Sequence, residues 1–208
     1  MAGYPAYSLL TGFIGTAWIS KALSDNGMSE EAYRLLQYEG YPSWLYPVKN
    51  GATTIWERLN SYTVKDGFGE NNSMNSFNHY SFGAVASWMY NYSLGICRDE
   101  KSPGFKHFIL KPEVDPTRGI THAEGYYDSM YGRIRSRWQY TDSGIRYEFT
   151  VPANTTASLY LPAPAVSFIS ENGKPLKKAS GVRYVSADKE LHHLELASGS
   201  YQFDIKQK

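Results

Sequence analysis

The stretch GATTIWERLNSY, residues 51–62, places a carboxylate directly beside an aromatic side chain. Glu57 follows Trp56, and two more acids, Asp66 and Glu70, come shortly after it. Cleavage of a glycosidic bond requires two carboxyl groups, one that protonates the leaving oxygen and one that activates water or attacks directly. A solvated surface charge is the commoner role for such a glutamate, so residue type alone makes Glu57 a candidate and no more.

Other common catalytic patterns do not occur in the sequence. It contains no G-x-S-x-G, no P-loop and no H-E-x-x-H. The five histidines, at positions 79, 107, 122, 192 and 193, lack the spacing of metal ligands, and the single cysteine, Cys97, lies in an apolar segment. The sequence therefore predicts neither a metal site nor a cofactor.

Composition narrows the classes of partner. The 208 residues carry a net charge of +1 with acids and bases interspersed, which indicates neither a nucleic-acid partner nor a charged membrane surface. No apolar run approaches the ~20 residues of a membrane span. The start has no signal-peptide pattern, and with one cysteine this favours the cytoplasm. Aromatic residues make up 15% of the chain, which suits sugar binding but equally suits β-sheets.

The first hundred residues are predicted to be helical. Apolar residues recur at helical spacing over residues 9–23, and Asp25-Asn26-Gly27 is typical of a helix end. A second helix is expected to begin with Ser29 as its N-cap and to end before Gly40. A third is expected from Asn75 or Ser76 to Ile96.

Residues 40–74 contain little that predicts regular structure. A connection of this length is usually functional or disordered, and its many Trp, Tyr and Phe side chains argue against disorder. We therefore expect a structured binding loop that includes Glu57. Within it, Trp44 and Trp56 are candidates for packing against a sugar ring, or equally for anchoring the loop in the core.

From about Pro103 the pattern changes to short strands. Five runs are rich in β-branched and aromatic residues, and turn signals lie at 142–144, 171–174 and 198–199. The runs are KHFILKPEV, GRIRSRWQYT, SGIRYEFTVP, ASLYLPAP and SYQFDIK. We expect a helical part, residues 1–102, followed by an antiparallel β-sandwich, residues 103–208. The helices have wide apolar faces, so they should pack on the sandwich or belong to something larger.

Three longer segments resemble one family of enzymes. They are LLTGFIGTAWISKALSDNG, YPSWLYPVKNGATTIWERLNSY and MNSFNHYSFGAVASWMYNYSLGI, and a later segment, YYDSMYGRIRSRW, continues the likeness. In this order they resemble consecutive parts of bacterial α-L-rhamnosidases, glycoside hydrolase family 78. The resemblance covers nearly the whole chain.

This resemblance implies a fold and roles for particular residues. It implies the last helices of an (α/α)6 catalytic barrel followed by a C-terminal β-sandwich, and inverting hydrolysis of terminal α-L-rhamnose. By the same resemblance Glu57 is the general base, and His79 contacts the rhamnose. The family's general acid belongs to an earlier acidic stretch, which we expect to precede residue 1, so the chain resembles a C-terminal fragment with weak or no activity alone.

Two alternatives stay open at this stage. One is a non-catalytic carbohydrate-binding or interaction module built on the sandwich, and the other is an inverting enzyme of the same barrel type acting on a different sugar. The expected partner is a rhamnose-containing glycoside or oligosaccharide. The sequence leaves open whether the chain forms a homodimer.

Overall fold

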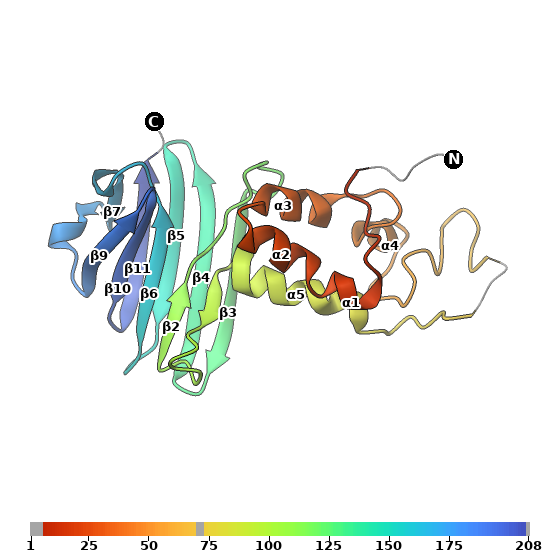
Figure 1. Cartoon of the computed structure of the whole chain (residues 1–208), viewed down its shortest axis with the longest axis horizontal. Helices are drawn as coiled ribbons and strands as arrows, with labels where there is room; N and C mark the ends of the chain where they lie inside the picture. Colours follow the sequence, from red (N-terminus) through yellow and green to blue (C-terminus); the bar gives the residue numbers. More distant parts are fainter. Residues whose placement is uncertain (1–5, 70–72, 207–208) are drawn as a thin grey trace. The chain divides into compact units, whose positions relative to one another are not determined.

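The computed structural model describes residues 6–69 and 73–206, and within these ranges the chain divides into two compact units. Unit 1 runs to Trp88 and includes Asp115–Gly119, whereas unit 2 comprises Met89–Val114 and the chain from Ile120 onwards (Figure 1). None of the helices in the described ranges is long and apolar enough to cross a membrane. The expected domains, residues 1–102 and 103–208, stay a proposal.

Unit 1 is built from short helices joined by irregular segments. Figure 1 shows α2 lying alongside α3, and these two make the most extensive helix–helix contact in the unit. Gln37, at the end of α3, donates a hydrogen bond from Nε2 to Asp115 Oδ2 at 2.8 Å and so fixes the segment 115–119 to this unit. The elements are α1 (Gly12–Thr16), α2 (Ile19–Asp25), α3 (Ser29–Gln37), α4 (Leu45–Lys49), η1 (Ser81–Ala84) and α5 (Val85–Trp88).

The helix expected over residues 9–23 is two helices. Gly12 has φ +61°, so regular helix begins only at that residue, and a turn at Ala17 and Trp18, whose backbone angles stay right-handed helical, separates α1 from α2. The predicted end is confirmed, because α2 stops at Asp25 and Gly27 adopts φ +74°. The Met28 N–H then donates to the Leu23 carbonyl at 2.8 Å, which satisfies a carbonyl of the last turn.

The second helix is confirmed with a shift of one residue at its start, since Met28 rather than Ser29 is the N-cap. The expected third helix differs more. It begins at Ser81, not at Asn75 or Ser76, and it passes through α5 into the π-helical turn η2 (Met89–Ser93).

Gly95 explains why the third helix stops before Ile96. This glycine has φ +68°, and a Cβ there would lie 2.1 Å from the backbone nitrogen of Pro112. The chain therefore turns at Gly95, and Ile96 begins strand β1.

Unit 2 consists of two β-sheets. The five-stranded sheet has the order β1 (Ile96–Arg98), β2 (His107–Leu110), β6 (Thr156–Pro162), β10 (Leu191–Leu196) and β9 (Val182–Asp188). The six-stranded sheet has the order β3 (His122–Ser129), β4 (Gly132–Thr141), β5 (Gly144–Val151), β11 (Gly199–Lys206), β7 (Ile169–Glu171) and β8 (Lys174–Pro175). All neighbouring strands are antiparallel except β2 and β6, which are parallel. Two 3₁₀ turns, η3 (Val166–Phe168) and η4 (Leu176–Lys178), flank β7 and β8.

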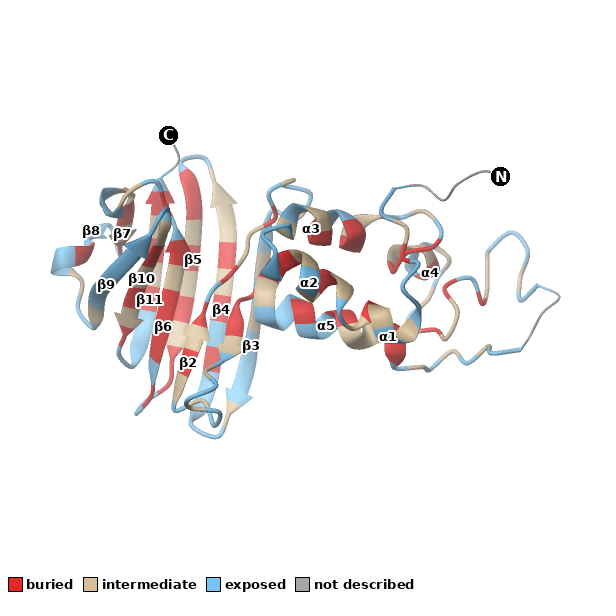
Figure 2. Cartoon of the chain, in the orientation of Figure 1, coloured by how far each residue is buried: buried red, intermediate tan, exposed pale blue. Residues whose placement is uncertain are grey.

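Period-two alternation gives each sheet one buried face. In β5 the side chains at 145, 147, 149 and 151 are buried, whereas those at 146, 148 and 150 are half-exposed (Figure 2). All five predicted runs contain strands, and the three predicted turns connect β4 to β5, β7 to β8 and β10 to β11. The expected helical part followed by an antiparallel sandwich is thus confirmed.

Two hydrogen bonds attach the end of η2 to the six-stranded sheet. Trp138 is fully buried, and its Nε1 donates to the Ser93 carbonyl at 2.8 Å. The neighbouring Ser136 donates from Oγ to the Leu94 carbonyl at 2.5 Å. Two consecutive carbonyls at the end of a helix are thereby satisfied by side chains of β4, which explains why residues 89–98 group with the sheets.

We expect Trp138→Phe to lower the free energy of unfolding of unit 2 by about 1–3 kcal/mol, because the Ser93 carbonyl loses its buried donor. Chemical denaturation followed by circular dichroism measures this loss. The matched control is Trp18→Phe, which alters a side chain 61% exposed and should change stability little. Equal effects of the two substitutions would show that the buried hydrogen bond is not what stabilises this region.

Candidate active site

Two extended segments of unit 1, residues 54–57 and 76–79, lie side by side and carry the predicted site residues. The Glu57 N–H donates to the Ser76 carbonyl at 2.9 Å, and the His79 N–H donates to the Ile55 carbonyl at 2.8 Å. The Thr54 hydroxyl adds a third bond, to the Phe77 carbonyl. Segments about twenty positions apart in sequence are thus held together by main-chain hydrogen bonds, and Glu57 and His79 lie on this paired region.

The Glu57 carboxylate is fixed at one oxygen. Its Oε2 accepts a hydrogen bond from the Ser76 N–H at 3.0 Å, which closes a reciprocal pair with the main-chain bond in the opposite direction. Within residues 6–69 and 73–206, the other oxygen accepts no hydrogen bond, and the side chain is half-exposed. A carboxylate held in this way has one oriented oxygen that can accept a proton from a bound water.

The His79 ring is positioned by stacking. It stacks on Phe13 at 4.9 Å between ring centroids and on Tyr80 at 5.3 Å. The Ser81 N–H approaches His79 Nδ1 at 3.4 Å, a long contact that favours Nδ1 as the acceptor. In the neutral ring the proton then lies on Nε2, which becomes a donor toward a ligand. The residue lies just ahead of η1 and not within a helix.

The two candidate tryptophans are buried. Trp44 is 7% exposed, and its Nε1 donates to the Phe82 carbonyl at 2.8 Å. Trp56 is 6% exposed and packs edge-on against Phe77 at 5.1 Å and Tyr62 at 6.5 Å. Packing accounts for both indoles without a ligand, aided at Trp44 by the hydrogen bond to Phe82, so their contact with a sugar stays a prediction.

The loop contains two other acidic residues, Asp66 and Glu70, and the structure describes only the first. Asp66 closes a tight turn: its N–H donates to the Thr63 hydroxyl at 2.9 Å, and that hydroxyl contacts Asp66 Oδ2 at 3.3 Å. Glu70 lies outside the described residues. No second candidate for a catalytic carboxyl is assigned in the described part of this loop.

Phe13 and Ser76 are the parts of the site that sequence reasoning missed. Phe13 packs beside His79 although it lies in α1, and Ser76 contributes only its backbone to Glu57. Neither role has a local signal, because stacking and main-chain pairing both depend on segments far apart in the chain.

Comparison with known proteins identifies two domain families. Residues 5–93 match the family described as the bacterial alpha-L-rhamnosidase 6 hairpin glycosidase domain. Residues 95–175 match the bacterial alpha-L-rhamnosidase C-terminal domain. The border between the two matches falls at the turn that contains Gly95, where the helical segment gives way to β1.

The individual proteins that this chain is similar to are also described as alpha-L-rhamnosidases. An alpha-L-rhamnosidase of Alteromonas sp. (strain LOR) is 36% identical over 95% of this chain, and one of Streptomyces avermitilis is 35% identical over 96%. The crystal structure of the Streptomyces avermitilis alpha-L-rhamnosidase complexed with L-rhamnose superposes with a TM-score of 0.84 at 34% identity, covering 96% of this chain and 18% of that one. The alpha-L-rhamnosidase from Dictyoglumus thermophilum gives a TM-score of 0.79 at 28% identity, covering 97% of this chain and 21% of that one. This chain spans about a fifth of the length of these relatives.

We expect Trp56→Ala to lower the free energy of unfolding of unit 1 by about 3–5 kcal/mol, because the aromatic cluster of Trp56, Tyr62, Phe68 and Phe77 loses its buried member. Denaturant titration followed by amide hydrogen exchange measures the change. Ile14→Ala, which truncates a side chain 84% exposed, should stay within about 0.5 kcal/mol of the parent. A stable Trp56→Ala variant would mean that the indole does not anchor the loop.

Proposed function

Because residues 5–93 belong to the six-hairpin glycosidase domain of bacterial α-L-rhamnosidases and residues 95–175 to their C-terminal domain, we propose that this chain takes part in hydrolysing α-L-rhamnosides. The substrate is a glycoside or oligosaccharide with a terminal α-L-rhamnose. The observation that carries the proposal is the Glu57 carboxylate, anchored at Oε2 by the Ser76 N–H within a segment that matches the glycosidase domain.

Glu57 acts as the general base in this proposal. Anchoring at Oε2 restricts the rotation of the carboxylate, so its other oxygen keeps one direction toward a water beneath the anomeric carbon. Transfer of a proton from that water to Glu57 makes the water nucleophilic as it attacks the sugar. Attack from the face opposite the leaving group inverts the configuration at the anomeric carbon.

An inverting reaction also requires a general acid on the other side of the glycosidic bond. The two carboxyl groups are ordinarily about 6.5–9.5 Å apart, which leaves room for the water. Asp66 does not suit this role, because it serves the turn at Thr63. We assign the general acid to no described residue, and the proposal for this chain is limited to the base and the sugar contacts.

His79 positions the sugar. Stacking on Phe13 and Tyr80 leaves its ring few orientations, and the contact from the Ser81 N–H directs the donor to Nε2. A hydrogen bond from Nε2 to a sugar hydroxyl therefore needs little reordering of the ring, which makes it effective for binding.

Glu57→Gln tests the base. The part of the Streptomyces avermitilis enzyme that this chain matches is replaced by this chain, and release of p-nitrophenol from p-nitrophenyl α-L-rhamnoside is followed. We expect the substitution to lower kcat by about 10²–10⁴-fold, because glutamine can still accept the Ser76 hydrogen bond but cannot take a proton. With the parent graft, proton NMR of the first rhamnose released should show the β-anomer, because inversion of an α-L-rhamnoside gives β-L-rhamnose.

Glu39→Gln is the matched control, because Glu39 forms an exposed ion pair with Lys49 at 2.9 Å. Its kcat should equal that of the parent graft. A Glu57→Gln graft that hydrolyses at the parent rate would refute Glu57 as the base. A graft that folds cooperatively yet neither binds rhamnose nor hydrolyses the rhamnoside would refute the proposed function.

His79→Phe tests the sugar contact. Phenylalanine keeps the stacking on Phe13 and removes the donor, so KM for the aryl rhamnoside should rise roughly tenfold, the equivalent of one hydrogen bond. Tyr80→Phe is the control, because it keeps the neighbouring ring and removes only an exposed hydroxyl. An unchanged KM in the His79→Phe graft would exclude a hydrogen bond from this ring to the substrate.

A further inference from the structure

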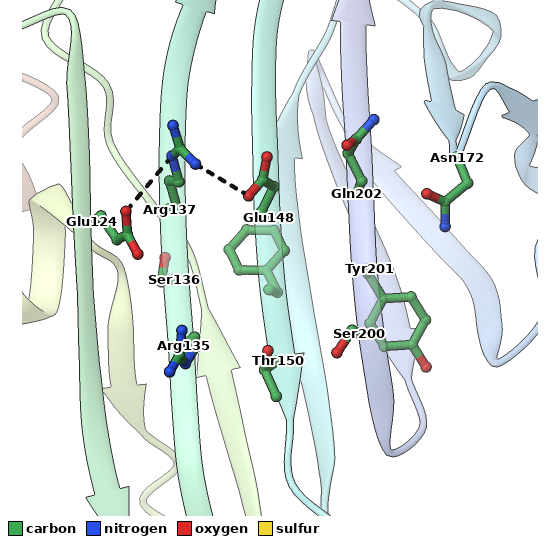
Figure 3. Close-up of a pocket in the computed structure, with 11 residues that line it drawn as sticks. Glu124, Arg135, Ser136, Arg137, Glu148, Thr150, Asn172, Ser200, Tyr201 and Gln202 are labelled. Atoms are coloured by element: carbon green, nitrogen blue, oxygen red, sulfur yellow. Dashed lines mark ion pairs between the residues drawn. The ribbon is translucent and has the colours of Figure 1, made fainter.

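The outer face of the six-stranded sheet in unit 2 carries a shallow depression of about 370 Å³. Its side chains come from five strands or their ends, and Figure 3 shows them standing on the sheet. Glu57 and His79 belong to unit 1, whereas the residues that line this depression all belong to unit 2. Nothing in the proposed hydrolysis uses its residues.

Strand register arranges these side chains in two rows that cross the strands. In the first row Glu124 of β3 faces Arg137 of β4, Arg137 faces Glu148 of β5, and Glu148 faces Gln202 of β11. The second row lies two residues away on each strand and consists of Arg135, Thr150 and Ser200, with Tyr126 beside Arg135 but outside the depression. With strands about 4.8 Å apart, the first row is about 14 Å long, which exceeds one sugar ring and suits a short chain.

Arg137 sits between two carboxylates without a hydrogen bond to either. Its Nε lies 3.8 Å from Glu124 Oε2, and its Nη1 lies 3.6 Å from Glu148 Oε2, both longer than a hydrogen bond (Figure 3). The Nε atom is buried and has no hydrogen-bond partner in the described structure, while Nη2 donates to Gln139 at 2.7 Å. The Arg137 side chain as a whole is 37% exposed, so a molecule lying on the sheet can contact the outer part of the guanidinium although Nε itself is covered.

Another arginine on the same sheet, Arg133, does form hydrogen bonds to its neighbouring carboxylate. Arg133 donates to both oxygens of Asp128, at 2.7 and 2.9 Å, and these hydrogen bonds lower the pKa of that carboxyl. That pair satisfies itself in the usual bidentate geometry. The looser contacts of Arg137 therefore do not reflect how arginine and carboxylate pair elsewhere on this face.

The side chains that line the depression favour a neutral ligand over an ion. Two carboxylates, Glu124 and Glu148, balance two guanidinium groups, Arg135 and Arg137, so the formal charge is zero. The remaining outward groups are the Gln202 and Asn172 amides and the Thr150 and Ser200 hydroxyls, which both donate and accept. The buried core of a protein interface is usually apolar and poor in charge, which this surface is not.

From this chemistry we propose that the two rows bind a neutral saccharide chain lying across the strands of the six-stranded sheet. Each sugar hydroxyl both donates and accepts, which matches the alternation of carboxylate, guanidinium, amide and hydroxyl along a row. Hydroxyls lying over the first row can accept from the exposed part of the Arg137 guanidinium and donate to its neighbouring carboxylates. The two parallel rows favour an extended oligosaccharide over a single sugar.

The test is a titration of the ¹⁵N-labelled 208-residue chain with xylohexaose, mannohexaose and cellohexaose, together with a hexamer of galacturonic acid and L-rhamnose alone. We expect at least one neutral hexasaccharide to shift the amide signals of β4, β5 and β11 with a Kd of about 1 mM or tighter. Arg135→Ala and Gln202→Ala should each weaken that Kd at least about fivefold. Arg183→Ala, an exposed arginine on β9 of the other sheet, is the matched control and should leave it unchanged.

Three results would overturn the proposal. They are the absence of shifts in these strands with every neutral hexasaccharide up to about 10 mM, a preference for the acidic hexamer, and equal weakening by Arg183→Ala. A Glu57→Gln chain should bind the hexasaccharide like the parent. The outcome of this titration and the outcome of the hydrolysis experiments are therefore independent.

Discussion

The reciprocal hydrogen bonds between Glu57 and Ser76 are the constraint on which the candidate active site depends. One runs from main chain to main chain and the other from the Ser76 N–H to the Glu57 carboxylate, so the same pairing that holds the loop also orients the carboxylate that we propose as the general base. The site therefore needs no regular helix or strand around Glu57. Buried aromatic side chains beneath the loop, including Trp44 and Trp56, supply the rigidity that secondary structure provides elsewhere.

Unit 1 carries large apolar side chains on its surface. Ile14 is 84% exposed, Trp18 61% and Leu10 59%, and the three lie close together in the sequence, within or beside α1. Patches of this kind usually mark a surface that contacts another molecule or another part of a protein. In unit 2, alternation along strands such as β5 buries apolar residues on the inner face and places polar residues on the outer face.

The same alternation gives unit 2 both its stability and its proposed saccharide site. Inward residues such as Phe149 and Tyr147 form the core, and the outward residues between them must be polar because they meet solvent. Antiparallel pairing then aligns outward residues of different strands into rows. A row of donors and acceptors thus arises directly from sheet geometry, and the identities of the residues determine which ligand the row fits.

The sequence by itself determined five of the strands (β2, β4, β5, β6 and β11), three turns and the family, since alternation, turn residues and ordered motifs such as ATTIWER are local features. It also located α3 and the end of α2, where Gly27 stops the helix. Only the tertiary structure decided the strand order, the burial of Trp44 and Trp56, the stacking of His79 on Phe13 and the bond from Ser76 to Glu57. The physical reason is that these features join residues far apart in the chain, whose contacts depend on packing and register and not on neighbouring residue types.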